Sequence, residues 1–96
     1  MEEKPKGHRI QIELPEDAAQ GIYSNLVIVS HSPSEFVLDF TRVLPGLKKA
    51  KVYSRIILSP KHAKFLLKTL SDNIEKFEGK FGKIKIDETT KKEIGF

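Results

Sequence analysis

Residues 59–79 read SPKHAKFLLKTLSDNIEKFEG, and this stretch decides the architecture. Ser59 is a favourable helix N-cap, and Pro60 suits the first helical position. Apolar residues then recur at steps of three and four, which places them on one stripe of a helix: Ala63, Leu66, Leu67, Leu70, Ile74 and Phe77. Gly79 is suited to close the C-terminus. The sequence therefore predicts a helix over residues 60–78 with one apolar face.

Four β-strands are predicted before this helix. Residues 10–14 alternate between apolar and polar, which is the period of a half-buried strand. Residues 22–30 contain an apolar run typical of a central strand. Strands over 35–44 and 50–58 follow, and the short connection after the second strand makes an antiparallel hairpin with the third. The expected fold is α+β, with a four-stranded antiparallel sheet and one long C-terminal helix packed on one face (β-β-β-β-α).

The length of 96 residues fits one domain. Residues 8–86 hold the predicted elements, residues 1–7 are expected to be a disordered leader, and residues 87–96 a mobile tail. The chain has no cysteine, which fits a reducing compartment. It shows neither a signal-peptide pattern nor an apolar run long enough to cross a bilayer. We therefore expect a cytoplasmic domain without membrane association.

The apolar surface predicted for the sheet exceeds what one helix covers. The helix is expected to cover one face, and the other face is predicted to hold Val27, Val29, Val37, Val43, Tyr53 and Ile57. Soluble monomers rarely expose an apolar patch larger than a few hundred Å². We expect a second copy to cover these residues, giving a homodimer or homotetramer. The alternative is that the tail folds over them.

Charge is unevenly distributed along the chain, whose net charge is +4. Residues 40–71 contain eight basic side chains and no acid, and the rest of the chain sums to −4. Within the helix, lysines come first and acids last, which opposes the helix dipole. An anion bound at the start of the helix would explain this order, with candidate ligands Arg55, Ser59, Lys61, Lys64 and Lys68. That anion is a phosphate, a nucleic-acid backbone or an acidic partner segment, and a solvated basic face is the alternative.

Residue patterns for catalysis or metal binding are missing. His8, His31 and His62 have no partner at metal-ligand spacing, and no cofactor is expected. There is no glycine-rich phosphate loop and no nucleophile elbow. Asp39 stands within an apolar strand, and it is either a buried acid with a shifted pKa, an outward-facing side chain, or the cross-strand partner of Arg55 or Arg42. The sequence thus predicts a protein that is not an enzyme.

Several short patterns occur in order: Tyr23-x-Asn25, Ser34-x-Phe36-x-Leu38-Asp39-Phe40, Arg55-Ile-Ile-Leu-Ser-Pro60 and Glu78-Gly-Lys-Phe-Gly-Lys-Ile84. In this the chain resembles a family of short bacterial and archaeal proteins known only as a domain of unknown function, over residues 8 to about 86. The resemblance implies no catalytic residues. The layout is also similar to that of the SecB export chaperone, a dimer of dimers that binds unfolded polypeptides. SecB is acidic and has a second helix, whereas this chain is basic.

Three functional interpretations follow from these observations. The first is a non-catalytic binding or adaptor domain that oligomerises through its sheet and offers a basic patch to an acidic protein partner. The second is a SecB-like chaperone that holds unfolded polypeptides. The third is non-specific nucleic-acid binding, for which Tyr53 near Arg55 offers one stacking platform but no known motif is present.

Overall fold

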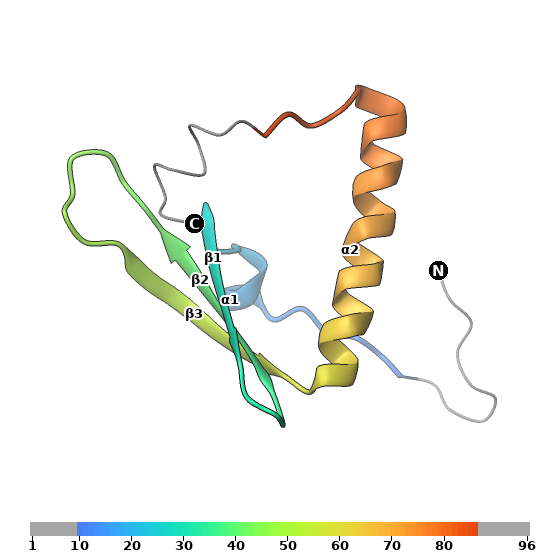
Figure 1. Cartoon of the computed structure of the whole chain (residues 1–96), viewed down its shortest axis with the longest axis horizontal. Coiled ribbons are helices and arrows are strands. Elements are labelled where there is room, and N and C mark those ends of the chain that lie inside the picture. Colours follow the sequence, from blue (N-terminus) through green and yellow to red (C-terminus); the bar gives the residue numbers. More distant parts are fainter. Residues whose placement is uncertain (1–9, 87–96) are drawn as a thin grey trace.

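The computed structural model describes residues 10–86 (Figure 1). It contains two helices and three strands in the order α1 (Glu16–Ala19), β1 (Leu26–His31), β2 (Phe36–Arg42), β3 (Lys51–Leu58) and α2 (Pro60–Phe81). The α+β class and the long helix after the sheet are therefore confirmed. The predicted leader at 1–7 and the predicted tail at 87–96 lie outside the described residues.

The sheet is antiparallel, with β2 between β1 and β3. The predicted hairpin between the second and third strands is confirmed as β1–β2, and its turn is closed by a 2.9 Å hydrogen bond from the Ser32 N–H to the Glu35 carbonyl. Opposed residues of neighbouring strands share a face. We call the face that carries Val29, Leu38 and Ile56 the groove face.

The prediction of a fourth strand at 10–14 is wrong. These residues are exposed and belong to no strand, and the chain passes from them through Pro15 into α1. Alternation of apolar and polar residues shows only that a segment is amphipathic. To form a strand, the segment must also pair in register with the edge of a sheet. Without the fourth strand, the part of the chain that the structure describes lacks the four-stranded layout on which the likeness to SecB was based.

Asn25 extends the pairing of β1 and β2 by one step. Its Nδ2 donates to the Val43 carbonyl at 2.9 Å, and its Oδ1 accepts the Val43 N–H at 2.8 Å. The preceding Ser24 hydroxyl donates to the Thr41 carbonyl at 2.8 Å. A side-chain amide thus takes the place of a backbone amide in the ladder, which gives Asn25 a structural role.

The buried core is small. Among residues 10–86, the buried hydrophobic side chains are Leu26 and Leu38, together with the buried polar residues Asp39 and Thr41. The expectation that the long helix packs along one sheet face is wrong, because α2 leaves the end of β3 and diverges from the sheet (Figure 1). Its apolar stripe therefore remains open, with Leu67 66% exposed.

The core assignment predicts a position-dependent effect of truncating leucine. Leu38→Ala should lower the free energy of unfolding by about 2–5 kcal/mol, because it opens a cavity in the central strand. Leu47→Ala, in the exposed loop between β2 and β3, is the matched control and should change it by less than about 0.5 kcal/mol. Urea unfolding followed by circular dichroism, at one fixed protein concentration, measures both. Equal losses would contradict the assignment of Leu38 to the core.

Candidate binding groove and basic surface

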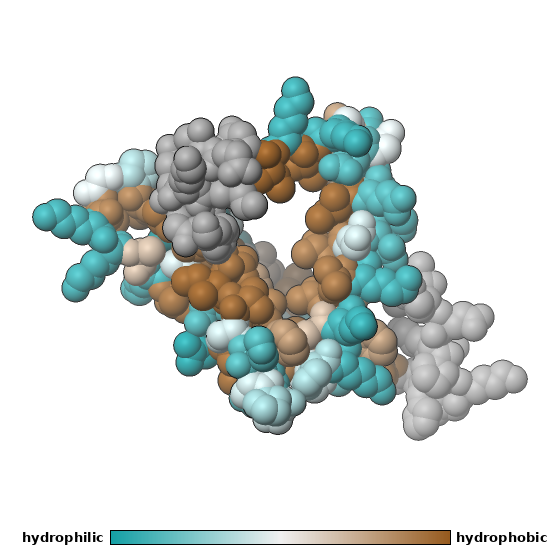
Figure 2. All heavy atoms as spheres, viewed as in Figure 1, coloured by the Kyte–Doolittle hydropathy of each residue, from teal (hydrophilic) through white to brown (hydrophobic). Residues whose placement is uncertain are grey.

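An apolar groove of about 400 Å³ lies between the sheet and the first half of α2. Its sheet wall is formed by three side chains and its helix wall by six: Val29, Phe36 and Leu38, then Pro60, Ala63, Lys64, Leu66, Leu67 and Leu70. Figure 2 shows hydrophobic side chains on the sides of the sheet and of α2 that face each other. Lys64 is the only charged residue that lines it, so the groove is an apolar site with one cation at its rim.

The groove exists because one residue joins β3 to α2. Ser59 accepts the His62 N–H at 3.2 Å through its hydroxyl, which also shares a 2.7 Å hydrogen bond with His62 Nδ1. Pro60 follows at the start of the helix, as predicted. A junction this short fixes the helix at the end of the sheet, with its apolar stripe turned toward the groove face.

The register divides the predicted oligomer surface between the two faces of the sheet. Val27 and Val29 lie on the groove face, opposite Phe40 and Leu38. Val37 and Ile57 pair with one another on the other face. The remaining two predicted residues lie elsewhere, because Tyr53 falls at a bulge in β3 and Val43 follows β2. The six residues therefore do not form one surface.

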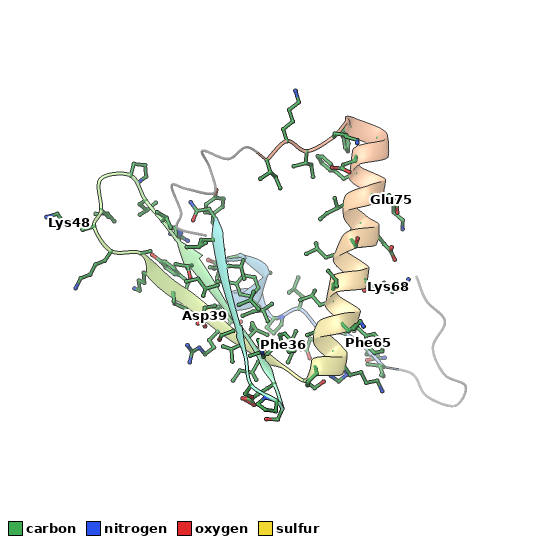
Figure 3. The ribbon with its side chains drawn as sticks, in the orientation of Figure 1. Phe36, Asp39, Lys48, Phe65, Lys68 and Glu75 are labelled. Atoms are coloured by element: carbon green, nitrogen blue, oxygen red, sulfur yellow. The ribbon has the colours of Figure 1, made fainter. Side chains whose placement is uncertain are left out.

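Two of the five predicted anion ligands form hydrogen bonds within the chain, and a third, Lys61, lies 5.9 Å from the centre of the Phe65 ring. Arg55 is paired with Asp39, and Ser59 caps α2. The lysines Lys61, Lys64 and Lys68 are exposed along the first half of α2. Lys68 projects away from the sheet, as Figure 3 shows, whereas Lys64 lies at the groove. The three lysines among the five predicted ligands thus lie on α2, and the anion site stays a prediction.

The acid-free stretch 40–71 forms two basic regions rather than one. One is the row of lysines on α2, and the other surrounds the loop between β2 and β3, where Lys48 projects far from Lys68 (Figure 3). There the Arg42 guanidinium lies 4.3 Å from the centre of the Tyr53 ring, and the Lys51 ammonium 5.1 Å from it. These cation–π contacts occupy the ring that was expected to stack on a nucleic-acid base.

Asp39 is the cross-strand partner of Arg55. Arg55 Nε donates to Asp39 Oδ1 at 2.7 Å, and Nη2 donates to Oδ2 at 3.0 Å. The hydrogen bond from Arg55 lowers the pKa of Asp39 from its ordinary value; burial opposes this effect and the charge of Arg55 adds to it. Both carboxylate oxygens are thus engaged, as in a structural ion pair. Asp39 is thus both buried and paired with Arg55 across the strands, and the pair is the main cause of its lowered pKa.

Neither a metal cluster nor a membrane span is found in the described part of the chain. Within residues 10–86, no group of three or more histidine and acidic side chains is placed to hold a metal ion. No helix in the same range is both long and apolar enough to cross a bilayer.

Comparison with known proteins identifies the family. The model of a family described as "Protein of unknown function (DUF3467)" matches residues 1–86. The chain belongs to this family. No curated protein and no solved structure matches the chain. The predicted resemblance to a family of unknown function is confirmed, and no activity comes with it.

In this DUF3467 protein, residues of the quoted patterns have structural tasks. Asn25 continues the β1–β2 ladder, Asp39 pairs with Arg55, and Ser59 with Pro60 starts α2. The sequence analysis missed the role of Asn25 and the groove itself. An asparagine just before an apolar strand was the available signal for the first. No signal in the sequence indicated the groove, because a groove depends on the angle between two elements.

The ion pair predicts a pH-dependent stability. The pKa of Asp39 is lower in the folded chain than its ordinary value of 3.8, so the pair stabilises the fold fully above that value. This contribution is lost as the pH falls through the lower folded pKa. Asp39→Asn should therefore be less stable than the wild type at neutral pH, and the difference should shrink below about pH 4.

Urea midpoints between neutral and acidic pH measure this difference. Asp72→Asn, which removes a carboxylate from the exposed surface of α2, is the matched control. A difference for Asp39→Asn that stays constant into acid would contradict the assigned pair.

Proposed function

We propose that this chain is a non-catalytic protein-binding domain, located in the cytoplasm, that works as a homo-oligomer. Its groove takes an amphipathic polypeptide segment that carries acidic side chains. The observation that carries this proposal is the open apolar groove with Lys64 at its rim. Soluble domains seldom leave a contiguous apolar hollow without an occupant.

The shape and charge of the groove specify the occupant. A groove along a helix suits a second helix that presents anchors at i, i+3, i+4 and i+7. Each aliphatic or aromatic anchor that becomes fully buried contributes about 1.5–3 kcal/mol. The lysines Lys61, Lys64 and Lys68, with no acid among residues 60–70, favour acidic flanks and repel basic ones.

Charge selection by the groove is directly testable with short amphipathic peptides. Two labelled peptides with the same apolar stripe are compared, one with glutamates and one with lysines on its polar face. We expect the glutamate peptide to bind at least about tenfold more tightly, a difference of about 1.4 kcal/mol. Lys64→Glu should reduce or reverse this preference. Fluorescence anisotropy at low and moderate salt measures it.

Two further variants control this experiment. Lys76→Glu makes the same charge change on α2 outside the groove lining and should leave the preference intact. Leu70→Asp, on the groove wall, should abolish binding of both peptides. Equal affinity for the two peptides in the wild type would refute charge selection, and no binding of either would refute the groove as a peptide-binding site.

A second candidate function is the holding of unfolded polypeptides. It is favoured by the extent of apolar surface beyond the groove, since α2 also exposes Ile74, Phe77 and Phe81, and the sheet exposes Ile57 on its other face. Several separate apolar surfaces suit clients without a defined sequence. The nucleic-acid interpretation has less support, because Arg42 and Lys51 lie over the Tyr53 ring and the cations are divided between two regions.

Holding activity predicts protection of a denatured test protein from aggregation. An equimolar amount of the chain should slow the rise of light scattering to the same extent at low and high salt, because apolar contacts are not screened. Leu70→Asp should reduce the protection and Lys76→Glu should not. A scattering curve that is unchanged by the chain would remove this candidate while leaving selective peptide binding in place.

A further inference from the structure

We propose that the occupant of the groove is the helix α2 of a second copy of this chain, packed antiparallel against α2 of the first. This inference deepens the proposed function and rests on its groove. It is carried by the spacing, the side-chain sizes and the charge order of α2.

The apolar stripe of α2 has the spacing of a coiled-coil seam. Without Leu66 and with Phe81 added, six of its side chains follow one another at steps of four, three, four, three and four, and we call them the seam: Ala63, Leu67, Leu70, Ile74, Phe77 and Phe81. The five steps cover 18 residues and average 3.6, and each two consecutive steps give the seven-residue repeat that paired helices use. The first three members line the groove, and the last three lie beyond its lining. The seam thus continues past the part of the sheet that faces it.

Side-chain sizes along the seam match in the antiparallel direction. If Leu70 lies opposite Ile74 of the second copy, then Leu67 lies opposite Phe77, and Ala63 opposite Phe81. The two smaller side chains, Ala63 and Leu67, each meet a phenylalanine, and Leu70 meets an isoleucine of equal size, which fills the layers evenly. A parallel pair would instead place two Phe81 rings together and two Ala63 methyl groups together, leaving one layer crowded and another empty.

The charges of α2 give the same direction. Residues 60–70 carry three lysines and no acid, while residues 71–81 carry three acids and two lysines. The antiparallel register above brings Lys64 beside Glu78 of the second copy, and the two-fold symmetry repeats this contact. It also explains a charge order that is unfavourable within one helix, because each half of α2 faces the complementary half of the other. A parallel pair would bring the two lysine rows together.

The exposed area of the seam is sufficient for a specific interface. From Leu67 to Phe81 its side chains are between 39% and 67% exposed. Each therefore has roughly 100 Å² to bury, given about 150–250 Å² for a whole aromatic side chain. Two copies together reach about 1,000 Å², near the lower bound for a specific interface, and the sheet wall of the groove adds to this. The second helix fills the groove, between the facing hydrophobic side chains of Figure 2.

Charge reversal on the full chain tests this pairing. Lys64→Glu and Glu78→Lys each create two like-charge contacts in a symmetric dimer. Each variant alone should raise the dimer dissociation constant by more than about tenfold, as measured by analytical ultracentrifugation. An equimolar mixture of the two variants restores opposite charges at both contacts and should recover the dimer. The chain carrying both substitutions should also dimerise, and Lys76→Glu is the matched control.

The mixture is the decisive sample. Glu78 also accepts the Ile84 N–H at 3.0 Å through Oε2, so Glu78→Lys alone disturbs a contact within the chain. A folding defect of this kind is not repaired by adding a second variant, whereas a lost intermolecular contact is. Circular dichroism of each variant checks that it folds. A mixture that stays monomeric, or single variants that remain fully dimeric, would overturn the pairing.

The peptide assay separates this inference from the proposed function. A wild-type dimer that the glutamate peptide dissociates supports both, because helix and peptide then compete for one groove. A wild-type monomer that binds the glutamate peptide overturns the pairing and leaves the proposed function standing. A chain that neither dimerises nor binds the peptide overturns both.

Discussion

The direction of α2 depends on the single residue between it and the sheet. Ser59 is extended, with φ −67° and ψ 158°, and its hydroxyl caps the helix while its backbone still continues the line of β3. Pro60 then fixes its own φ near −65°, so neither residue has room to swing the helix. The angle between α2 and the sheet, and with it the groove, follows from these two residues. A longer or more flexible junction would let the stripe collapse onto the sheet and leave nothing to receive a partner.

Local patterns allowed some of this structure to be predicted and not the rest. The cap, the proline and the 3–4 spacing define α2 without reference to other elements, and the short turn at Ser32 defines the hairpin. The sequence could not show which face of the sheet each residue of β1 lies on. Leu26 to Val29 are all apolar, and an unbroken apolar run has no alternation from which to read the face. Only the register with β2 places Val29 on the groove face. The prediction of a strand at 10–14 was wrong for the opposite reason. This segment alternates between apolar and polar residues, but no strand lies beside it.

The candidate site shows the same division between local and distant effects. The excess of positive charge was visible in the sequence, but which cations stay available depends on the nearest suitable partner. Arg55 lies opposite Asp39 in the ladder and pairs with it there. Ser59 accepts a hydrogen bond from the first turn of α2. Lys61 and Lys64 remain because their neighbours one turn away are lysines or apolar residues, and Lys68 forms no ion pair with Asp72, four residues further along α2. Predicting which side chains pair in this way requires the fold, whereas the net charge can be counted from the sequence.

Under the proposed pairing, the small core of residues 10–86 would make the stability of the chain depend on its own abundance. Leu26 and Leu38 alone bury too little apolar area for a comfortable margin of stability, so under the proposed pairing each copy is completed by another. Newly made chains at low copy number would spend more time open and would be cut by proteases before they meet. Above a threshold of synthesis they would protect one another. The amount of the protein in a cell would then rise more steeply than in proportion to its expression.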